Sequence, residues 1–172
     1  MGKPRSTSAG RVAGRPRMPK GYGIPPAKSA KDYVPWSWAE ERLQRARSYW
    51  VATTRPDGRP HLMPVWAVWV GGALYFGTDR GSRKGRNVAA NPAMAVHVDT
   101  EDDAVILEGK ACEVTDRPTL EAVDRAYLKK YRMKLTDAPG DSFFLELRPR
   151  VVFAWSEQDF GKKATRFYSE VK

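Results

Sequence analysis

Residues 80–87, with the sequence RGSRKGRN, have the composition of an anion-binding segment. They follow a predicted strand that ends in Gly77 and Thr78, and they open a predicted helix. A helix N-terminus presents unpaired N–H groups and the positive end of the helix dipole, so an anion bound there gains backbone hydrogen bonds as well as side-chain charge. Ser82 is suited to capping the helix or contacting a phosphate oxygen, Arg83 offers a planar pair of donors, and Lys84 offers a compact positive charge.

The alternative is that residues 80–87 form only a solvated basic face, and composition alone does not separate the two interpretations. Positive side chains at a helix N-terminus oppose the dipole and each cost a few tenths of a kcal/mol. A bound anion would relieve that cost, which favours a binding role for this segment.

Other reactive side chains are few. The single cysteine, Cys112, excludes an internal disulfide and a thiolate metal cluster, and we expect it to be a small buried apolar residue. The two histidines, His61 and His97, have no motif around them, and we expect His97 to be a core or interface residue. The acidic residues of segment 99–103 lack the glycine and ligand spacing of a calcium loop, so a solvated turn is expected there.

The elements that would position these residues are short and closely spaced. Ser37 and Glu40 form a capping-box pattern at the start of a predicted helix. The sequence RPDGR at 55–59 has the residues of a tight hairpin turn. We predict helices at 37–47, 82–91 and 118–131, the last with Leu120, Val123, Tyr127 and Leu128 on one face, and strands at 49–54, 60–70, 73–78, 93–98, 104–115, 143–147, 151–155 and 165–168.

Antiparallel strands joined by turns, with few and peripheral helices, favour a mainly β protein built as a small closed or partly closed barrel. The uncharged stretch 60–78 is then accounted for by strands, so no membrane span is expected. The single cysteine and the lack of a secretory signal favour a cytoplasmic protein.

The charge of the chain is unevenly distributed. The net charge is +10, yet residues 1–35 carry eight basic side chains against one acidic one, so the rest of the chain is close to neutral. Residues 1–35 are also rich in proline and glycine, and we expect a basic flexible arm followed by one domain at 36–172. Tyr22 and Ile24 could instead anchor this arm on the body or on a partner. A nucleic-acid-binding function is not favoured, because the domain has no recognisable base-reading module.

The order of motifs resembles the pyridoxamine 5'-phosphate oxidase-like superfamily, and more closely its branch of flavin- and deazaflavin-dependent oxidoreductases. The resemblance covers about residues 36–168. It rests on the RPDGR turn, the strand with MPVW at 63–66, the strand with YFGT at 75–78, the SRKGRN block at 82–87 and the Asn91-Pro92 pair. It implies a split β-barrel of the FMN-binding-protein type that forms a homodimer, with a cofactor between the protomers.

The resemblance also implies roles for individual residues. Arg83 and Lys84 would hold the cofactor phosphate, and Ser82 and Asn87 belong to the same block. The other cofactor-contacting positions implied are His61, Leu62, Met63, Pro64, Val65 and Trp66 along the ring, Gly77 and Thr78 near the ribityl chain and phosphate, and Trp155 and Arg166 late in the chain.

Two departures narrow the expected activity. The true pyridoxamine phosphate oxidases carry arginine and lysine where this chain has His61 and Trp66, and their C-terminal substrate signature is absent, so vitamin B6 synthesis is not expected. Trp66 suits a large planar substrate or a deazaflavin. The resemblance makes coenzyme F-420 the first choice of cofactor and FMN the second, for hydride transfer to a planar conjugated substrate.

Several alternatives remain open from the sequence. A substrate proton could come from His61, Tyr75 or water, although Tyr75 and Trp69 are expected to be barrel core or dimer contacts. The chain could also be a flavin or haem carrier without turnover, because a fold does not dictate a function.

Overall fold

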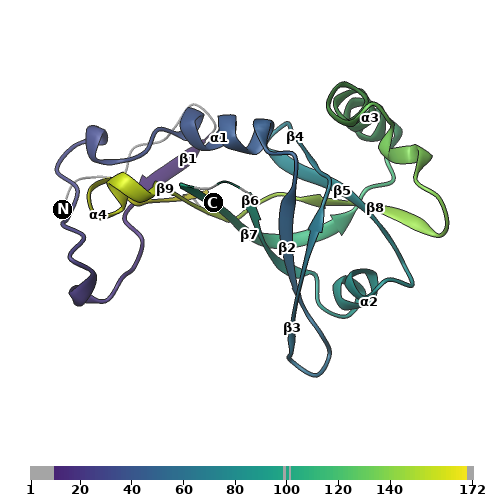
Figure 1. Ribbon diagram of the computed structural model, residues 1–172, viewed down its shortest axis with the longest axis horizontal. Helices are drawn as coiled ribbons and strands as arrows, with labels where there is room; N and C mark the ends of the chain where they lie inside the picture. Colours follow the sequence, from purple (N-terminus) through teal and green to yellow (C-terminus); the bar gives the residue numbers. More distant parts are fainter. Residues whose placement is uncertain (1–9, 99, 101, 170–172) are drawn as a thin grey trace.

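The computed structural model describes residues 10–98, 100 and 102–169. This part of the chain forms ten strands and four α-helices (Figure 1). The strands are β1 (Arg11–Gly14), β2 (Tyr49–Thr54), β3 (Pro60–Val65), β4 (Val68–Val70), β5 (Ala73–Asp79), β6 (Ala93–Val98), β7 (Asp103–Glu113), β8 (Ser142–Leu147), β9 (Val151–Ser156) and β10 (Thr165–Ser169). The helices are α1 (Trp36–Arg45), α2 (Arg83–Ala90), α3 (Arg117–Tyr131) and α4 (Phe160–Lys163).

All strand pairs in the described part are antiparallel, and the main order is β1-β10-β9-β7-β6-β2-β3. β4 pairs with β5, β5 with β8, and β8 with the end of β7, so the sheet bends round without closing. Figure 1 shows α3 above and α2 below the part of the sheet that contains β5 and β8. The expected fold class, a mainly β split barrel with short peripheral helices, is confirmed.

Strand β7 joins the two parts of the sheet. Its first residues pair with β9, whereas Ala111–Glu113 pair with β8. Gly109 lies between these two stretches, where an added Cβ would stand 2.9 Å from Leu147 Cδ1 and 3.0 Å from the Arg148 carbonyl oxygen. Because backbone and core atoms approach so closely, only glycine fits at this point of the strand.

The core follows from the alternation of apolar residues along the strands. Tyr49, Phe76 and Phe167 are fully buried in the main cluster, which α1 covers with Trp36, Ala39 and Leu43. Helix α3 forms a second cluster with β4 and β5 through Val123, Tyr127 and Tyr131. The expected burial of Trp69 and Tyr75 is confirmed.

The N-terminal segment is more ordered than its composition predicts. Residues 11–14 form β1, which pairs with β10, and Val12 is buried. Arg11 donates a hydrogen bond to the Pro149 carbonyl oxygen (3.1 Å) and lies 4.8 Å from the centre of the Trp36 ring. Residues 11–14 thus join the sheet, because a few buried residues and main-chain pairing offset the ordering entropy, while the division into an arm at 1–35 and a domain at 36–172 stays a prediction. Residues 1–9 lie outside the described part, and Tyr22 is exposed rather than docked on the body.

Four local predictions are also corrected. The expected strand 60–70 is two strands, β3 and β4, which belong to different parts of the sheet. Ser37 does not cap α1, which begins at Trp36 after Pro35; the capping box is formed by Ser29 and Asp32 instead. Leu128 is 48% exposed, and Tyr131 takes its place in the core. Cys112 is exposed, because it lies on the opposite face of β7 from the buried Ala111.

The acidic segment 99–103 contributes an ion pair. Asp103 Oδ2 lies 2.6 Å from Arg42 Nε, while residues 99 and 101 lie outside the described part. Within residues 10–98, 100 and 102–169 there is no group of three potential metal ligands, and no helix is long and apolar enough to cross a membrane.

Candidate functional site

The N-terminus of α2 is fixed against the end of β5. Ser82 caps the helix, since its Oγ accepts a hydrogen bond from the Gly85 N–H (2.9 Å) and lies 3.0 Å from Thr78 Oγ1. Gly85 is required here, because a Cβ would stand 2.3 Å from the Asp79 carbonyl oxygen. The first turn of α2 is therefore held in one position at the end of β5.

Positive side chains gather around this helix end. Lys84 is partly buried, with Nζ 5.8 Å from the centre of the Phe76 ring, and burial lowers its pKa. Among the described residues, neither Lys84 nor the exposed Arg83 takes part in an ion pair. The Nε of Arg55 is buried with no hydrogen-bond acceptor in the described part of the structure. These cations have positive charge available for an anion.

His61 joins this group from β3. Burial lowers the pKa of His61, and the charges of Arg55, Lys84 and Arg83 lower it further. Both effects favour the neutral imidazole over the cation. The hairpin end of β3 and α2 lie together, because Thr53 Oγ1 is 3.5 Å from His61 Nδ1 and 3.0 Å from Asn87 Nδ2.

A series of polar side chains connects His61 to the buried side of α2. Asn87 is fully buried on α2, and its Nδ2 donates a hydrogen bond to Thr53 Oγ1 on β2 (3.0 Å). Thr53 Oγ1 lies 3.5 Å from His61 Nδ1. Asn87, Thr53 and His61 thus link α2, β2 and β3 across the core.

β3 carries exposed apolar side chains. Leu62, Met63 and Trp66 are 55%, 47% and 53% exposed, and Pro64 is also exposed. Because side chains alternate along a strand, Leu62 and Pro64 lie on one face of β3 and Met63 lies on the face of His61 and Val65. Among the described strands, β3 lies at the end of the main order and pairs with β2, so these side chains lie at an edge of the sheet, where a ligand can reach them.

Trp66 is held in place by α3. Its ring is parallel to that of Tyr131 (3°, with centroids 5.0 Å apart), and its carbonyl oxygen accepts a hydrogen bond from the Tyr127 hydroxyl (2.5 Å). Tyr131 also accepts a hydrogen bond from the Ala67 N–H (3.1 Å). These contacts break the strand between β3 and β4 and set the direction of the indole.

The structure brings together most, but not all, of the expected site residues. Ser82 contacts Thr78, and Asn87 is linked through Thr53 to His61, so these residues lie around the start of α2 with Arg83 and Lys84, whereas Trp66 follows the far end of β3. Val65 instead faces the core, and a Cβ at Gly77 would meet Leu135, 3.0 Å away, on the side of α3. Tyr75 is buried in the α3 cluster, which removes it as a proton source for a ligand on β3.

Trp155 and Arg166 lie elsewhere in the same chain. Trp155 is on β9 and packs against Phe160, and Arg166 is on β10 with its guanidinium 5.3 Å from the Tyr168 ring. β9 is four strands from β3, a separation of roughly 20 Å at about 4.8 Å per strand. One chain therefore does not place these two residues beside Arg83 and Lys84.

Sequence reasoning missed Thr53, Arg55, Tyr127 and Tyr131. Arg55 opens the RPDGR turn, and its place beside the SRKGRN block becomes evident only from the hairpin. The tyrosines of α3 carried a helical periodicity that indicated core, but no local signal for contact with Trp66.

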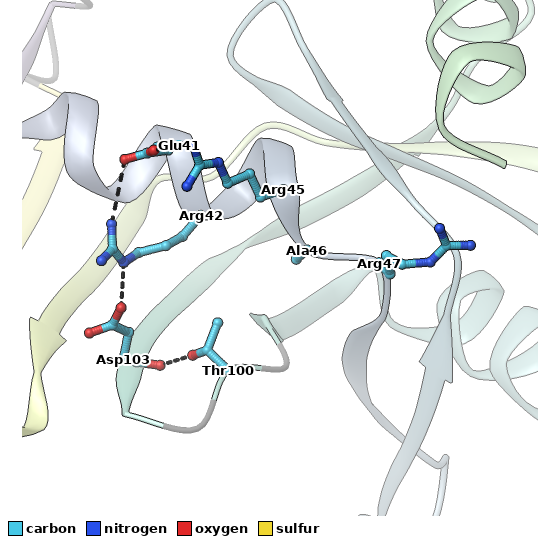
Figure 2. A pocket seen from close by; sticks show the side chains of 7 residues that line it. All are labelled: Glu41, Arg42, Arg45, Ala46, Arg47, Thr100 and Asp103. Atoms are coloured by element: carbon cyan, nitrogen blue, oxygen red, sulfur yellow. Dashed lines mark hydrogen bonds and ion pairs between the residues drawn. The ribbon is translucent and has the colours of Figure 1, made fainter.

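A separate polar pocket of about 500 Å³ lies between the end of α1 and the start of β7 (Figure 2). Arg42 lies there between Glu41 and Asp103, so its charge is already compensated. Arg47 lines this pocket, but its guanidinium points away from the other charged side chains. None of the expected site residues lines this pocket.

The region around β3 and α2 has the features that a phosphate-bearing cofactor with a flat ring requires. Ser82 and the partly buried Lys84 provide a capped helix end with a positive charge that no carboxylate of the described chain pairs with. Met63 lies on the same face of β3 as His61, which is linked through Thr53 to α2, and provides an apolar surface for a ring. A flavin or deazaflavin phosphate fits this donor set.

Comparison with known proteins identifies the family. The model of the pyridoxamine 5'-phosphate oxidase family matches residues 38–156. The chain belongs to this family. No curated protein sequence matches the chain.

The solved structures with a fold similar to that of this chain have different descriptions. A conserved hypothetical protein from Mycobacterium tuberculosis is 21% identical, with a TM-score of 0.65, 78% of this chain and 93% of that chain being covered. An F420 reductase is 30% identical, with a TM-score of 0.52, and 64% of this chain and 91% of that chain are covered. The heme storage protein HutZ from Vibrio cholerae is 16% identical, with a TM-score of 0.58, and 66% and 88% are covered.

Proposed function

We propose that this member of the family is an oxidoreductase that uses the deazaflavin coenzyme F-420, or alternatively FMN, to transfer hydride to a planar conjugated organic substrate. The observation that carries the proposal is the partly buried Lys84 at the capped end of α2, which forms no ion pair with any described residue, together with the exposed apolar side chains of β3. The 30% identity to an F420 reductase favours the deazaflavin over FMN.

The residues of the chain would bind and orient the cofactor. Arg83 and Lys84 would hold the phosphate, Ser82 would add the helix end, and Met63, on the same face of β3 as His61, would support the ring. The bound cofactor supplies the hydride chemistry, which makes an acid–base residue optional. Burial and the nearby cations lower the pKa of His61, so it would serve as a hydrogen-bonding group positioned by Thr53.

The proposal includes a homodimer, because Trp155 and Arg166 can take part only if a second copy brings them to the site. The outer sheet surface offers a face for that copy. Trp50, His97, Ile106 and Phe153 are neighbours in register across β2, β6, β7 and β9, and all are at least partly exposed. Light scattering would give twice the chain mass, and an Ile106→Glu variant would shift the protein toward monomer and weaken cofactor binding.

The test of the cofactor site is a parallel titration of the apo-protein with FMN and coenzyme F-420, followed by tryptophan fluorescence. We expect micromolar or tighter binding of F-420, weaker binding of FMN, and substrate-dependent oxidation of reduced F-420. Arg83→Ala should weaken binding about 10-fold or more, since a charge-assisted hydrogen bond contributes about 1.5–3 kcal/mol. Arg86→Ala is the matched control, because Arg86 is exposed on the same helix and bonds the Gly81 carbonyl oxygen. Absence of binding by both cofactors would refute the proposal.

The alternative function is a carrier of flavin or haem without turnover. The likeness to a heme storage protein concerns the fold alone at 16% identity. A haem titration read at the Soret band distinguishes the two functions. Stoichiometric haem binding without F-420 or FMN binding would favour the carrier.

A further inference from the structure

Two cations lie at the opposite end of β3 from Arg83 and Lys84. The Arg47 guanidinium lies 6.0 Å, and Lys130 Nζ 5.4 Å, from the centre of the Tyr131 ring. Within residues 10–98, 100 and 102–169, neither forms an ion pair. Arg47 is exposed, and Figure 2 shows it pointing away from the Arg42–Asp103 pair.

Lys130 is held by neutral groups only. Its Nζ donates hydrogen bonds to the Tyr49 hydroxyl (2.8 Å) and to the Ala67 carbonyl oxygen (3.1 Å). Burial and the nearby charge of Arg47 lower the pKa of Lys130 to about 8, so it remains mostly protonated at pH 7. A partly buried ammonium beside a second positive charge, with no ion pair to either among the described residues, destabilises the fold, and a bound anion would offset that cost.

Tyr131 connects these cations to the indole of Trp66, because it contacts both of them and also stacks on the indole. One face stacks on Tyr131, and the side chain remains 53% exposed, so it still presents area to a ligand. The hydrogen bond from Tyr127 to the Trp66 carbonyl oxygen fixes the main chain beneath it. A platform held in this way binds a flat ring with little further loss of side-chain entropy.

We propose that Trp66, Arg47 and Lys130 form a substrate subsite that selects planar conjugated carboxylic acids. The ring of the acid stacks on Trp66, and the carboxylate is bound by Arg47 and Lys130. This inference rests on the proposed function, since it names the substrate class for the same site. Trp66 lies five residues beyond His61, about 17 Å along an extended strand, so these cations are separate from those that hold the phosphate.

The test is equilibrium dialysis of the full chain with 2-naphthoate and the neutral analogue 2-naphthamide, each with and without FMN or F-420. We expect 2-naphthoate to bind roughly 10-fold tighter at pH 7, the scale of one charge-assisted contact. Lys130→Met and Arg47→Gln should each remove most of this preference while leaving 2-naphthamide binding unchanged. The matched controls are Lys129→Met on the same helix and Arg45→Gln on α1, both exposed in the native chain.

Equal affinity for the two probes would overturn the subsite. An equal loss of the preference for 2-naphthoate in the control variants would also overturn it, as would a loss of this preference confined to Arg83→Ala. Arg47→Gln changes an exposed side chain and keeps the test valid even if Lys130→Met fails to fold. Selective 2-naphthoate binding without binding of either cofactor would refute the proposed function but retain the subsite. Binding of a cofactor without a preference for 2-naphthoate over 2-naphthamide would refute the subsite but retain the proposed function.

Discussion

A Lys84→Met substitution tests whether Lys84 serves ligand binding or the stability of the fold. The ammonium of Lys84 is partly buried without an anionic partner among the described residues, and its lowered pKa reports the cost of that burial. Methionine preserves the length of the side chain beside Phe76 and removes the charge. We expect the free energy of unfolding of the apo-protein to rise by on the order of 1 kcal/mol.

The same substitution should weaken cofactor binding. Loss of one charge-assisted hydrogen bond to a phosphate costs about 1.5–3 kcal/mol, which corresponds to roughly 10- to 150-fold in Kd. Urea unfolding of the apo-protein and titration with F-420 and FMN measure the two effects, with Arg86→Met as the control on the same helix. A Lys84→Met protein that is less stable, or that binds both cofactors as tightly as the native chain, would refute this account of the α2 site.

Three further predictions concern the elements around the site. Ser82→Ala should lower the free energy of unfolding by about 1 kcal/mol through loss of the helix cap, as measured by urea denaturation, and Ser82→Asp should retain most of the stability. Gly85→Ala should be more destabilising than Ser82→Ala, because its Cβ would stand 2.3 Å from the Asp79 carbonyl oxygen; equal stability would contradict the observed close approach. The folded-state pKa of Lys130 is about 8, below its ordinary value of 10.5. Between these two pH values the unfolded chain binds more protons than the folded chain, so the free energy of unfolding should increase as the pH rises from 8 to 10. After allowance for partial solvent exposure this gain is about 1 kcal/mol, and it should be missing in Lys130→Met when unfolding is compared at the two pH values.

The parts of the fold that sequence predicts well are those with a local signal. The RPDGR turn, the alternation in β6 and the serine before α2 each act over a few residues, and the structure contains the hairpin, the strand and the capped helix. β1 was missed because its stability comes from β10, more than 150 residues away, and from the contact of Arg11 with Trp36.

The candidate site also contains residues that no local sequence pattern identifies. The block at 82–87 indicated an anion site, but Arg55 and Thr53 have no pattern that connects them with it. The break between β3 and β4 has a tertiary cause, since Tyr127 and Tyr131 bind the main chain at Trp66 and Ala67. Local sequence therefore predicted one continuous strand.

The position of β3 at the edge of the sheet has a consequence for aggregation. An exposed apolar edge strand is a template onto which another chain can add a strand. β3 contains Pro60 and Pro64, and neither has an N–H to donate to an incoming strand. The protein can thus leave a strip of apolar side chains uncovered for a ligand while its backbone resists the growth of intermolecular sheets.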